Sequence, residues 1–209
     1  MCARCSPGGE VRPFKKLESC AAPFFQPNID TDQIIPARFL PKPRSGGFGQ
    51  YLFHDLRFDP SGAERPEFVL NQPAHRGARV VVANANFGCG SSRENAVWAL
   101  HDYGVEVVIA PSFGDIFYNN CIKNGLLPVH LPEAVVTDLL ARIAETPNLA
   151  IQVDLEAQTV TLPDGSAHAF EIDSFAKYCV LNGFDELDYT LSHRDEIDAF
   201  VNRYGREND

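Results

Sequence analysis

The sequence predicts an α/β fold, and three observations support this class. Short apolar segments alternate with helical segments between residues 78 and 146, which is typical of a sheet covered by helices. A stretch with a central turn signal follows at residues 149–172 and indicates a β-rich addition. The chain has 209 residues, enough for a substantial hydrophobic core. We therefore expect a single domain over residues 1–209, with a β-rich elaboration after the α/β core.

The first part of the chain carries weaker signals than the rest. Residues 1–22 are expected to lead into the first strand, with residues 1–11 as a loose N-terminal leader. Residues 28–40 combine a polar turn with an apolar pair, and a proline after that pair limits regular structure. Residues 41–50 predict a mobile loop, because proline and glycine dominate PKPRSGGFGQ. A short helix is expected at residues 51–59.

The middle of the chain predicts strands and helices in alternation. In the helix expected at 94–104, apolar side chains lie three or four residues apart, and Gly104 is a natural end for it. The expected elements, in chain order, are a buried strand at 78–87, the helix at 94–104, a buried strand at 105–111, a helix at 112–125, a short strand at 126–132 and an amphipathic helix at 133–146.

The C-terminal part predicts a hairpin and two helices. Residues 149–172 indicate a β-hairpin whose turn is the PDG sequence at residues 163–165. Two helices are expected after it, one starting at Asp173 and one at Ser192. Both side chains are suited to accept hydrogen bonds from the first amides of a helix, so we expect them to be N-caps.

Charge and hydropathy exclude several classes of protein. The chain has 18 Lys and Arg against 28 Asp and Glu, a formal net charge of −10. Such an acidic chain without a basic cluster is a poor binder of nucleic acids or anionic membranes. No apolar run approaches the ~18 residues that span a bilayer, and the N-terminus lacks the apolar segment of a secretory signal. We expect a cytoplasmic protein.

The six cysteines do not predict a metal centre in this chain. Cys2 and Cys5 form a C-x-x-C pair without a convincing second half for a metal site and without the βαβ context of a redox motif. The remaining cysteines are dispersed and do not have the spacing of iron–sulfur ligands. They are expected to be reduced and packed in the fold; they are Cys20, Cys89, Cys121 and Cys179.

The motif FGCGSSREN at residues 87–95 carries the main chemical signal. It joins a predicted strand to a predicted helix, and it matches neither a dinucleotide fingerprint, a P-loop nor a nucleophile elbow. The backbone amides from Gly90 to Arg93 can face an anion at the helix start, and Arg93 can hold a carboxylate with two hydrogen bonds. Ser91 or Ser92 can donate to an oxygen or, deprotonated, accept a proton. Alternatively, one of these serines is only the N-cap of the helix.

A second polar cluster precedes this motif in the chain. Its residues are Asp30, Thr31, Asp32 and Gln33. The two carboxylates can order a basic partner such as Arg93 or take part in acid–base chemistry. The alternative is an Asx-type turn that leads into a strand. The residues alone leave both interpretations open.

These motifs, in this order, resemble a known family. The segments that carry the resemblance are NIDTDQIIPARFL at 28–40, NFGCGSSRENAVWAL at 86–100, FGDIFYNNCIKNGLLPV at 113–129 and LDYTL at 187–191. Together they resemble the small subunits of bacterial 3-isopropylmalate dehydratase, in the aconitase superfamily, over about residues 12–203. The resemblance implies a swivelling β/β/α domain, as in the mobile fourth domain of aconitase.

The resemblance also implies a partner and a reaction. The partner is a large subunit, in a heterodimer or a larger complex, which carries a 4Fe-4S cluster with one iron open to substrate. No cofactor is then expected on this chain. The substrate is a small dicarboxylate, 2-isopropylmalate, which is isomerised to 3-isopropylmalate through 2-isopropylmaleate in leucine biosynthesis. The open iron acts as a Lewis acid on the departing hydroxyl group.

Within the GSSR motif, the resemblance assigns roles to individual residues. Ser91 is the base, Arg93 binds a substrate carboxylate, and Ser92 contacts the substrate. A free serine is a weak base at neutral pH, so its alkoxide needs hydrogen-bond donors and Arg93 in a closed, dry site. The amides from Gly90 onward are suited to supply such donors. The last residue of the family's GSSREH pattern is Asn95 here, which changes no reacting group.

Outside the GSSR motif, Thr31 and Asp32 are expected to shape the site, because the family places the DTD sequence near this loop. Arg44, in the loop at 41–50, is a candidate contact for a substrate carboxylate; the alternative is a solvated loop arginine. This loop differs from the RTGFG sequence of many bacterial small subunits, and it is expected near the variable part of the substrate.

Three alternatives remain for the function. The first is the small subunit of a citraconate or maleate hydratase, whose methyl-substituted substrates need less apolar room than isopropylmalate. A non-catalytic binding module is suggested by RNA-binding relatives of aconitase, but the acidic composition argues against it. A stand-alone serine hydrolase would need a histidine that activates Ser91, and none of the six histidines lies in a triad-like context.

Overall fold

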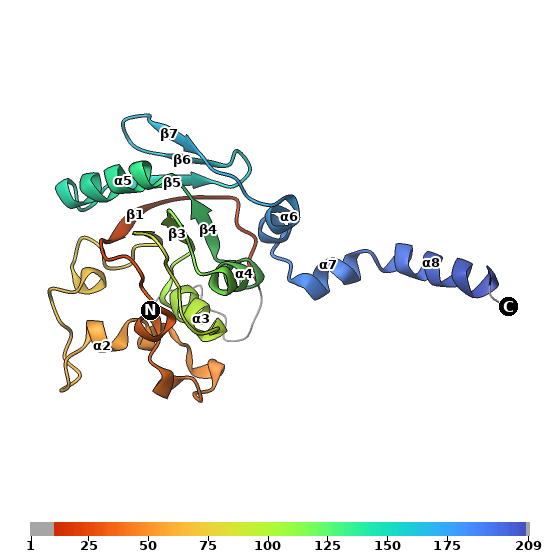
Figure 1. The fold of residues 1–209 in the computed structure, drawn as a ribbon, viewed down its shortest axis with the longest axis horizontal. Coiled ribbons are helices and arrows are strands. Elements are labelled where there is room, and N and C mark those ends of the chain that lie inside the picture. The colour runs from red at the N-terminus through yellow and green to blue at the C-terminus, as the bar shows by residue number, and fades with distance from the viewer. Residues whose placement is uncertain (1–10, 208–209) are drawn as a thin grey trace.

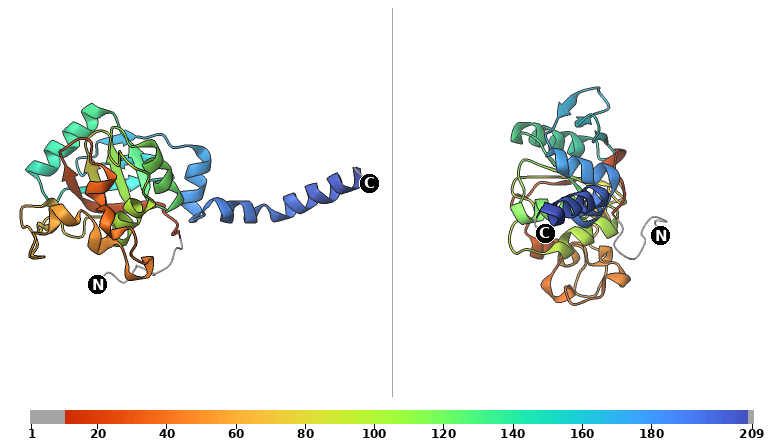
Figure 2. Two further views of the ribbon diagram at one scale, coloured as in Figure 1. Left: turned by 60° about the horizontal axis from the view of Figure 1, so that its bottom comes forward. Right: turned by 90° about the vertical axis from the view of Figure 1, so that its right-hand side faces the viewer.

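The computed structural model of the chain describes residues 11–207. The leader expected at 1–11 therefore lies outside the described residues except for Val11, and Cys2 and Cys5 lie outside them as well. A compact body contains a sheet with helices on both faces, and a C-terminal arm of two helices extends away from this body (Figures 1 and 2).

One seven-stranded sheet organises the described residues, in the order β4-β3-β2-β1-β5-β6-β7 (Figure 1). Strands β1 to β4 pair in parallel, whereas β1 pairs with β5 and the following strands pair in an antiparallel way. The strands are β1 (Lys16–Phe24), β2 (Val80–Ala83), β3 (Val107–Ala110), β4 (Leu127–His130), β5 (Ala150–Asp154), β6 (Thr159–Thr161) and β7 (Ala167–Ala169).

The helices cover both faces of the sheet and form the arm. None of those in the described part of the chain is long and apolar enough to cross a membrane. The α-helices are α1 (Thr31–Ile34), α2 (His54–Arg57), α3 (Glu94–Tyr103), α4 (Asp115–Lys123), α5 (Glu133–Glu145), α6 (Ser174–Asn182), α7 (Glu186–Ser192) and α8 (Arg194–Glu207). Short 3-10 helices are η1 (Ala37–Phe39), η2 (Arg44–Gly46), η3 (Gly49–Tyr51) and η4 (Val69–Asn71).

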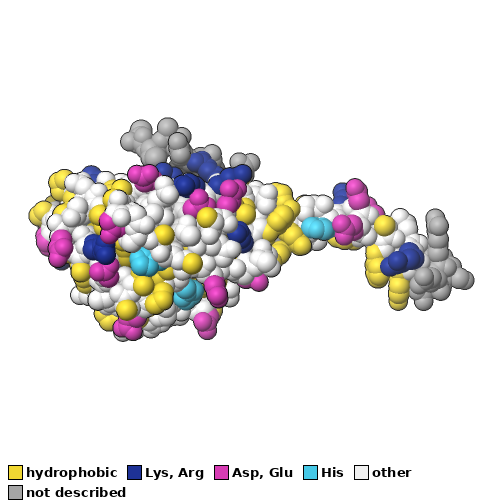
Figure 3. All heavy atoms as spheres, turned by 90° about the horizontal axis from the view of Figure 1, so that it is seen from above, with side chains coloured by type: hydrophobic (Ala, Val, Ile, Leu, Met, Phe, Trp, Pro, Cys, Tyr) yellow, Lys and Arg dark blue, Asp and Glu magenta, His cyan; other side chains and the backbone are white. Residues whose placement is uncertain are grey.

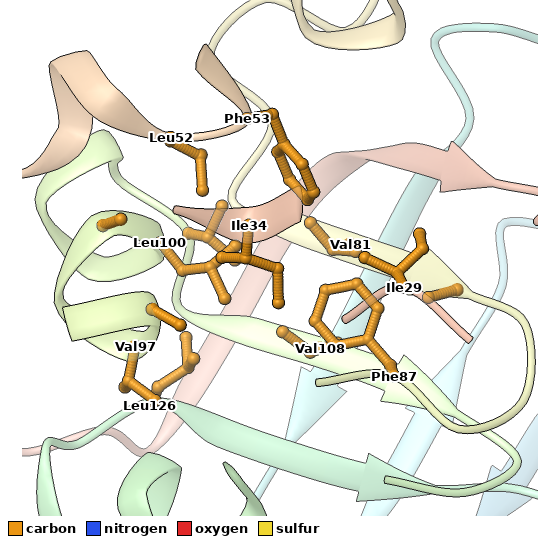
Figure 4. Close-up of a cluster of buried hydrophobic side chains, with 14 of the residues drawn as sticks. Ile29, Ile34, Leu52, Phe53, Val81, Phe87, Val97, Leu100, Val108 and Leu126 are labelled. Atoms are coloured by element: carbon orange, nitrogen blue, oxygen red, sulfur yellow. The ribbon is translucent and has the colours of Figure 1, made fainter. Parts of the chain in front are cut away.

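The core lies on both sides of the parallel strands, which explains their composition. All residues of β2 and β3 are buried, and they are Val, Ile or Ala, as expected for strands covered on both faces. Val81 and Val108 face the cluster that also contains Leu100 of α3 and Ile34 of α1 (Figure 4). The alternate strand residues, such as Val80, face a second cluster with the apolar side of α5. The predicted α/β class and the alternation at 78–146 are confirmed.

The first strand corrects the prediction for the N-terminal region. Lys16–Phe24, expected as part of a leader, is the strand β1 between β2 and β5. Its sequence lacks a regular alternation, because its second half is buried on both faces while its first half is partly exposed. Pro23 also lies within it, paired with Val82. Proline in a central strand is rare, and it hides the strand from sequence patterns.

The C-terminal region differs from the prediction in two ways. The turn at residues 163–165 joins β6 to β7 as predicted, but β5 precedes them and an additional turn at residues 155–158 joins β5 to β6. That turn has no glycine or proline, and Gln158 itself adopts the left-handed conformation, with φ +53°. Asp173 caps α6 as predicted. Ser192 does not cap a helix: it ends α7, and its hydroxyl donates to the Tyr189 carbonyl oxygen at 2.6 Å.

The second half of the loop at 41–50 is tied to α3. Phe48 is fully buried, and its backbone N–H donates to the carboxylate of Asp102 at 2.8 Å. Gly49 lies so close to α3 that a Cβ there would be 2.6 Å from the backbone nitrogen of Tyr103. The buried Arg57 guanidinium donates to the carbonyl oxygens of Gly49 and Leu52 at 3.3 and 3.2 Å. The mobility expected for this loop stays a prediction for residues 41–47, which precede the buried Phe48.

Replacement of Leu100 by alanine should lower the free energy of unfolding by about 2–5 kcal/mol, because its side chain is fully buried in the core that α3 shares with the sheet. Leu187→Ala is the matched control: this leucine is 63% exposed, and its removal should cost less than about 0.5 kcal/mol. Urea unfolding of the isolated chain measures both. Equal losses would contradict the placement of Leu100 in the core.

Candidate active site

Two loops meet where β1 and β2 end. These strands are parallel neighbours, so their carboxyl ends lie at the same edge of the sheet. The pairing continues beyond both strands through three backbone hydrogen bonds, which join Asn28 N–H to Ala85 O at 2.9 Å, Gly88 N–H to Ile29 O at 2.7 Å and Thr31 N–H to Cys89 O at 2.9 Å. The DTD sequence therefore lies directly against the GSSR loop.

Thr31 fixes the path of the GSSR loop. It is buried, and its hydroxyl donates to the carbonyl oxygen of Ser91 at 2.8 Å. Asp30 is the N-cap of α1, where its carboxylate accepts from the Gln33 N–H at 2.7 Å and the Gln33 side chain accepts from the Asp30 N–H at 3.3 Å. This capping box corrects the alternative of a turn into a strand, since a short helix follows instead.

Arg93 pairs with Asp32 across the two loops. Its Nη1 donates to the Asp32 carboxylate and, at 3.5 Å, to the carbonyl oxygen of Ile35. The Arg93 side chain is 14% exposed, whereas that of Asp32 is 57% exposed. The Nε and Nη2 groups of Arg93 make no hydrogen bond with any residue of 11–207, so they remain available to an anion. The predicted ordering of Arg93 by a carboxylate of this cluster is confirmed.

The two serines of the loop are not helix caps. Helix α3 begins at Glu94 with Arg93 as its N-cap, and no side chain of the described residues caps it. The N-cap alternative for Ser91 or Ser92 is therefore wrong. Both residues are exposed, and within the described part of the chain their hydroxyls make no hydrogen bond. The amides at the start of α3 likewise have no side-chain acceptor from these residues.

A shallow cavity of about 160 Å³ lies between the GSSR loop and the start of α4. Four of the residues expected at the site line it: Thr31, Gly90, Ser91 and Arg93. The opposite wall is formed by residues 114–117, at the N-terminus of α4. The starts of α3 and α4 thus both border the cavity, and each adds positive potential there. Asp115 adds a negative charge to the α4 wall, so a small anion is best held on the side of Arg93.

The α4 wall escaped the sequence analysis, although a signal for it exists. The segment FGD at residues 113–115 leads from β3 into α4, as the GSSR loop leads from β2 into α3. A bridge between Phe87 and Phe113 joins these neighbouring connections, and Gly114 N–H donates to Phe87 O at 2.9 Å. Parallel strands place such strand-to-helix junctions at one edge of the sheet, so the second junction points to the same site.

Glycine is required where these two connections touch. Gly88 has φ +72°, and a Cβ there would be 2.2 Å from the ring of Phe117. A Cβ on Gly114 would be 2.6 Å from the carbonyl oxygen of Gly88. The start of α4 can approach the GSSR loop this closely only because neither position carries a side chain.

Three expected site residues lie outside the cavity lining: Asp32, Ser92 and Arg44. Asp32 acts on the site only through its ion pair with Arg93. Ser92 is next to the lining residue Ser91 but does not line the cavity itself. Arg44 lies over the ring of Trp98, with its guanidinium carbon 4.4 Å from the ring centroid, on the side of α3. This cation–π contact explains the position of Arg44 in the isolated chain, and the structure does not bring it together with the GSSR loop.

The described residues do not fit an iron–sulfur cluster. No three His, Cys, Asp or Glu side chains within 11–207, the four cysteines there included, are arranged to hold a metal ion. Cys89 lies in the GSSR loop, where burial and the nearby Asp30 carboxylate raise the pKa of its thiol. It is therefore not poised as a thiolate.

Comparisons with known proteins agree on one family. The model of the aconitase C-terminal domain matches residues 11–134, and the model LeuD_N matches residues 131–174. A 3-isopropylmalate dehydratase small subunit of Rhodospirillum centenum is 53% identical over 93% of this chain and 96% of its own length. One from Cereibacter sphaeroides is 51% identical over 91% and 94%. A crystal structure of 3-isopropylmalate dehydratase from Methanocaldococcus jannaschii matches with a TM-score of 0.62 and 26% identity, over 89% of this chain and 99% of that one.

Gly88→Ala should disrupt the site through the contact with Phe117. Any residue with a Cβ costs about 1–2 kcal/mol in the left-handed conformation, and the clash adds ~1–3 kcal/mol. Gly62→Ala is the control, because Gly62 also has a positive φ of +84° but has open space around its Cα. Chemical unfolding of the isolated chain compares the two. If both variants lose the same stability, the close approach of α4 to the loop is refuted.

Proposed function

The chain belongs to the family of 3-isopropylmalate dehydratase small subunits, in the aconitase superfamily, and from this premise we propose that it supplies half of a shared active site. The reaction is the isomerisation of 2-isopropylmalate to 3-isopropylmalate through 2-isopropylmaleate, in leucine biosynthesis. The observation that carries this proposal is the cavity between the starts of α3 and α4. Ser91, whose hydroxyl makes no hydrogen bond within residues 11–207, and Arg93, which is paired with Asp32, both line it.

Arg93 is the carboxylate-binding group in this proposal. Asp32 and the Ile35 carbonyl engage only its Nη1, so Nε and Nη2 can together hold one carboxylate of the substrate. The amides at the start of α3, from Gly90 onward, and the start of α4 favour the same negative charge. Ile116, 52% exposed on the cavity wall, offers an apolar surface to the alkyl group of the substrate.

Ser91 is the base in this proposal. It acts as an alkoxide, which takes the proton from the carbon next to a substrate carboxylate. Removal of this proton and of the substrate hydroxyl gives 2-isopropylmaleate, and return of water in the opposite sense gives 3-isopropylmalate. An exposed serine cannot hold an alkoxide at neutral pH. The site must therefore be closed by another chain, so that Arg93 and the helix amides stabilise the anion in a dry environment.

The large subunit is the chain that closes the site in this proposal, and the iron–sulfur cluster belongs to it. The lack of a metal-binding group within residues 11–207 supports this assignment. The exposed part of the 41–50 loop, with Arg44, would approach the substrate on closure. The free thiols of Cys20, Cys89 and Cys121 support a location in the reducing cytoplasm.

The first test mixes this chain with its large subunit, with the cluster reconstituted, and follows isopropylmalate turnover under anaerobic conditions. We expect turnover only in the mixture. Ser91→Ala should lower kcat by about 10²–10⁴-fold, because the proton acceptor is lost. The control is binding of the variant to the large subunit, which should be unchanged. Faster turnover of citraconate would reassign the substrate, and full activity of Ser91→Ala would refute the role of the base.

Asp32→Asn should raise KM for isopropylmalate by about three- to tenfold and change kcat less, because Arg93 loses the charge that orients it while the base remains. Asp55→Asn is the matched control, since Asp55 is as exposed as Asp32 and forms an ion pair with Arg38 away from the cavity. Steady-state kinetics of the reconstituted complex measures both. An unchanged KM for Asp32→Asn would show that the ion pair does not position Arg93.

A further inference from the structure

The C-terminal arm, α7 and α8, carries an apolar stripe that the body of the chain leaves open. Figure 3 shows hydrophobic side chains at the root of the arm and again near its far end. On α8, the stripe has the spacing i, i+3, i+4, i+7 of a single helix face. Its members are 43% to 63% exposed; they are Leu187 and Leu191 on α7, and Ile197, Phe200, Val201 and Tyr204 on α8.

The direction of the arm is set at its root. The ring of Tyr189 on α7 packs edge-on against Phe175 and Tyr178 of α6, with centroid distances of 4.7 and 5.6 Å. A helix of 14 residues is marginal in water by itself, so α8 needs a surface on which its apolar face is buried. An exposed stripe of this kind marks a site of protein association.

We propose that this arm docks on the large subunit, with its apolar stripe in an apolar groove of that chain whose edges are basic. This inference rests on the proposed function, because it takes the large subunit as the partner that covers the stripe. It goes beyond that function by assigning the surface that holds the two chains together.

The arm is continuous with the face that the large subunit must cover. Helix α4 borders both regions: Phe117 lines the catalytic cavity, and the next residue, Tyr118, lines a groove of about 450 Å³ between α4 and α6. Phe175 and Phe184 continue this groove to the root of α7. A chain that closes the cavity over the exposed Ile116 can therefore extend across the groove to the root of the arm.

The charge of the arm favours a basic partner over a second copy of this chain. Residues 186–207 contain six acidic and three basic side chains, and the whole chain has a formal net charge of −10. Two such arms side by side would bring like charges together, which is unfavourable around an interface. A large subunit with Lys or Arg along the edges of its own apolar groove would complement the acidic arm.

The test measures the dissociation constant of the complex between the full-length small chain and the purified large subunit. Phe200→Asp and Val201→Asp place a charge in the stripe, and each should weaken the complex about tenfold or more. Phe200→Leu keeps the position apolar and should bind the large subunit about as tightly as the wild type. The matched control is Asn202→Asp, because Asn202 is exposed on the opposite side of α8. We also expect the wild-type complex to weaken as salt rises to ~0.5 M.

Two results would overturn the proposal. In one, Phe200→Asp and Val201→Asp bind the large subunit as tightly as Asn202→Asp does, while circular dichroism shows the variants folded. In the other, the wild-type small chain dimerises alone through the arm, and Phe200→Asp makes it monomeric without any effect on large-subunit binding. Sedimentation of the small chain alone detects this second case.

Ser91→Ala separates this proposal from the proposed function. It should bind the large subunit with wild-type affinity and be inactive, because Ser91 lies in the cavity rather than on the arm. If the wild-type complex needs the apolar stripe to form but does not turn over isopropylmalate, the proposed function is refuted and the docking surface is supported. At saturating large subunit, Phe200→Asp should retain wild-type kcat, since the catalytic residues are unchanged.

Discussion

The GSSR loop depends on backbone pairing that continues past the ends of two parallel strands. Residues 28–31 run alongside residues 85–89, and Thr31 completes this pairing by donating its N–H to Cys89 and its hydroxyl to Ser91. Neither segment belongs to a regular strand there, so each supplies the hydrogen-bond partners that the other lacks. The loop is held through its carbonyl oxygens and amides. Within residues 11–207, the hydroxyls of Ser91 and Ser92 take no part in the interactions that hold it.

The ion pair between Asp32 and Arg93 orients the Arg93 side chain and adds little to the stability of the fold. Asp32 is mostly exposed, so its attraction for Arg93 is screened by water and contributes little to folding. Arg93, in contrast, is nearly covered, and its guanidinium plane is defined by Asp32 on one side and the Ile35 carbonyl. A substrate carboxylate therefore meets a cation that is already aligned and only partly engaged. Less conformational entropy is lost on binding than with a free arginine.

Sequence patterns predicted the parts of this fold in which local and tertiary preferences agree. The fully apolar strands β2 and β3 and the helix α3, with its glycine end, needed no knowledge of distant contacts. The failures have tertiary causes. β1 is recognisable only from its two neighbours, because Pro23 and irregular burial obscure it. Arg44 is held by Trp98, which is distant in sequence. The pairing of Asp32 with Arg93 was foreseen from their chemistry, whereas the α4 wall depends on glycines at 88 and 114 that meet only in space.

The position of β1 has a consequence for biosynthesis of the chain. Its parallel partner, β2, begins at residue 80, but its antiparallel partner, β5, begins only at residue 150. On the ribosome, one edge of β1 therefore stays open while more than a hundred further residues are made, although the GSSR loop and both helices beside the cavity have already been synthesised. An open strand edge is a template for wrong pairing between nascent chains. The stretch after residue 146 thus does more than extend the sheet, because β5 covers this open edge of β1.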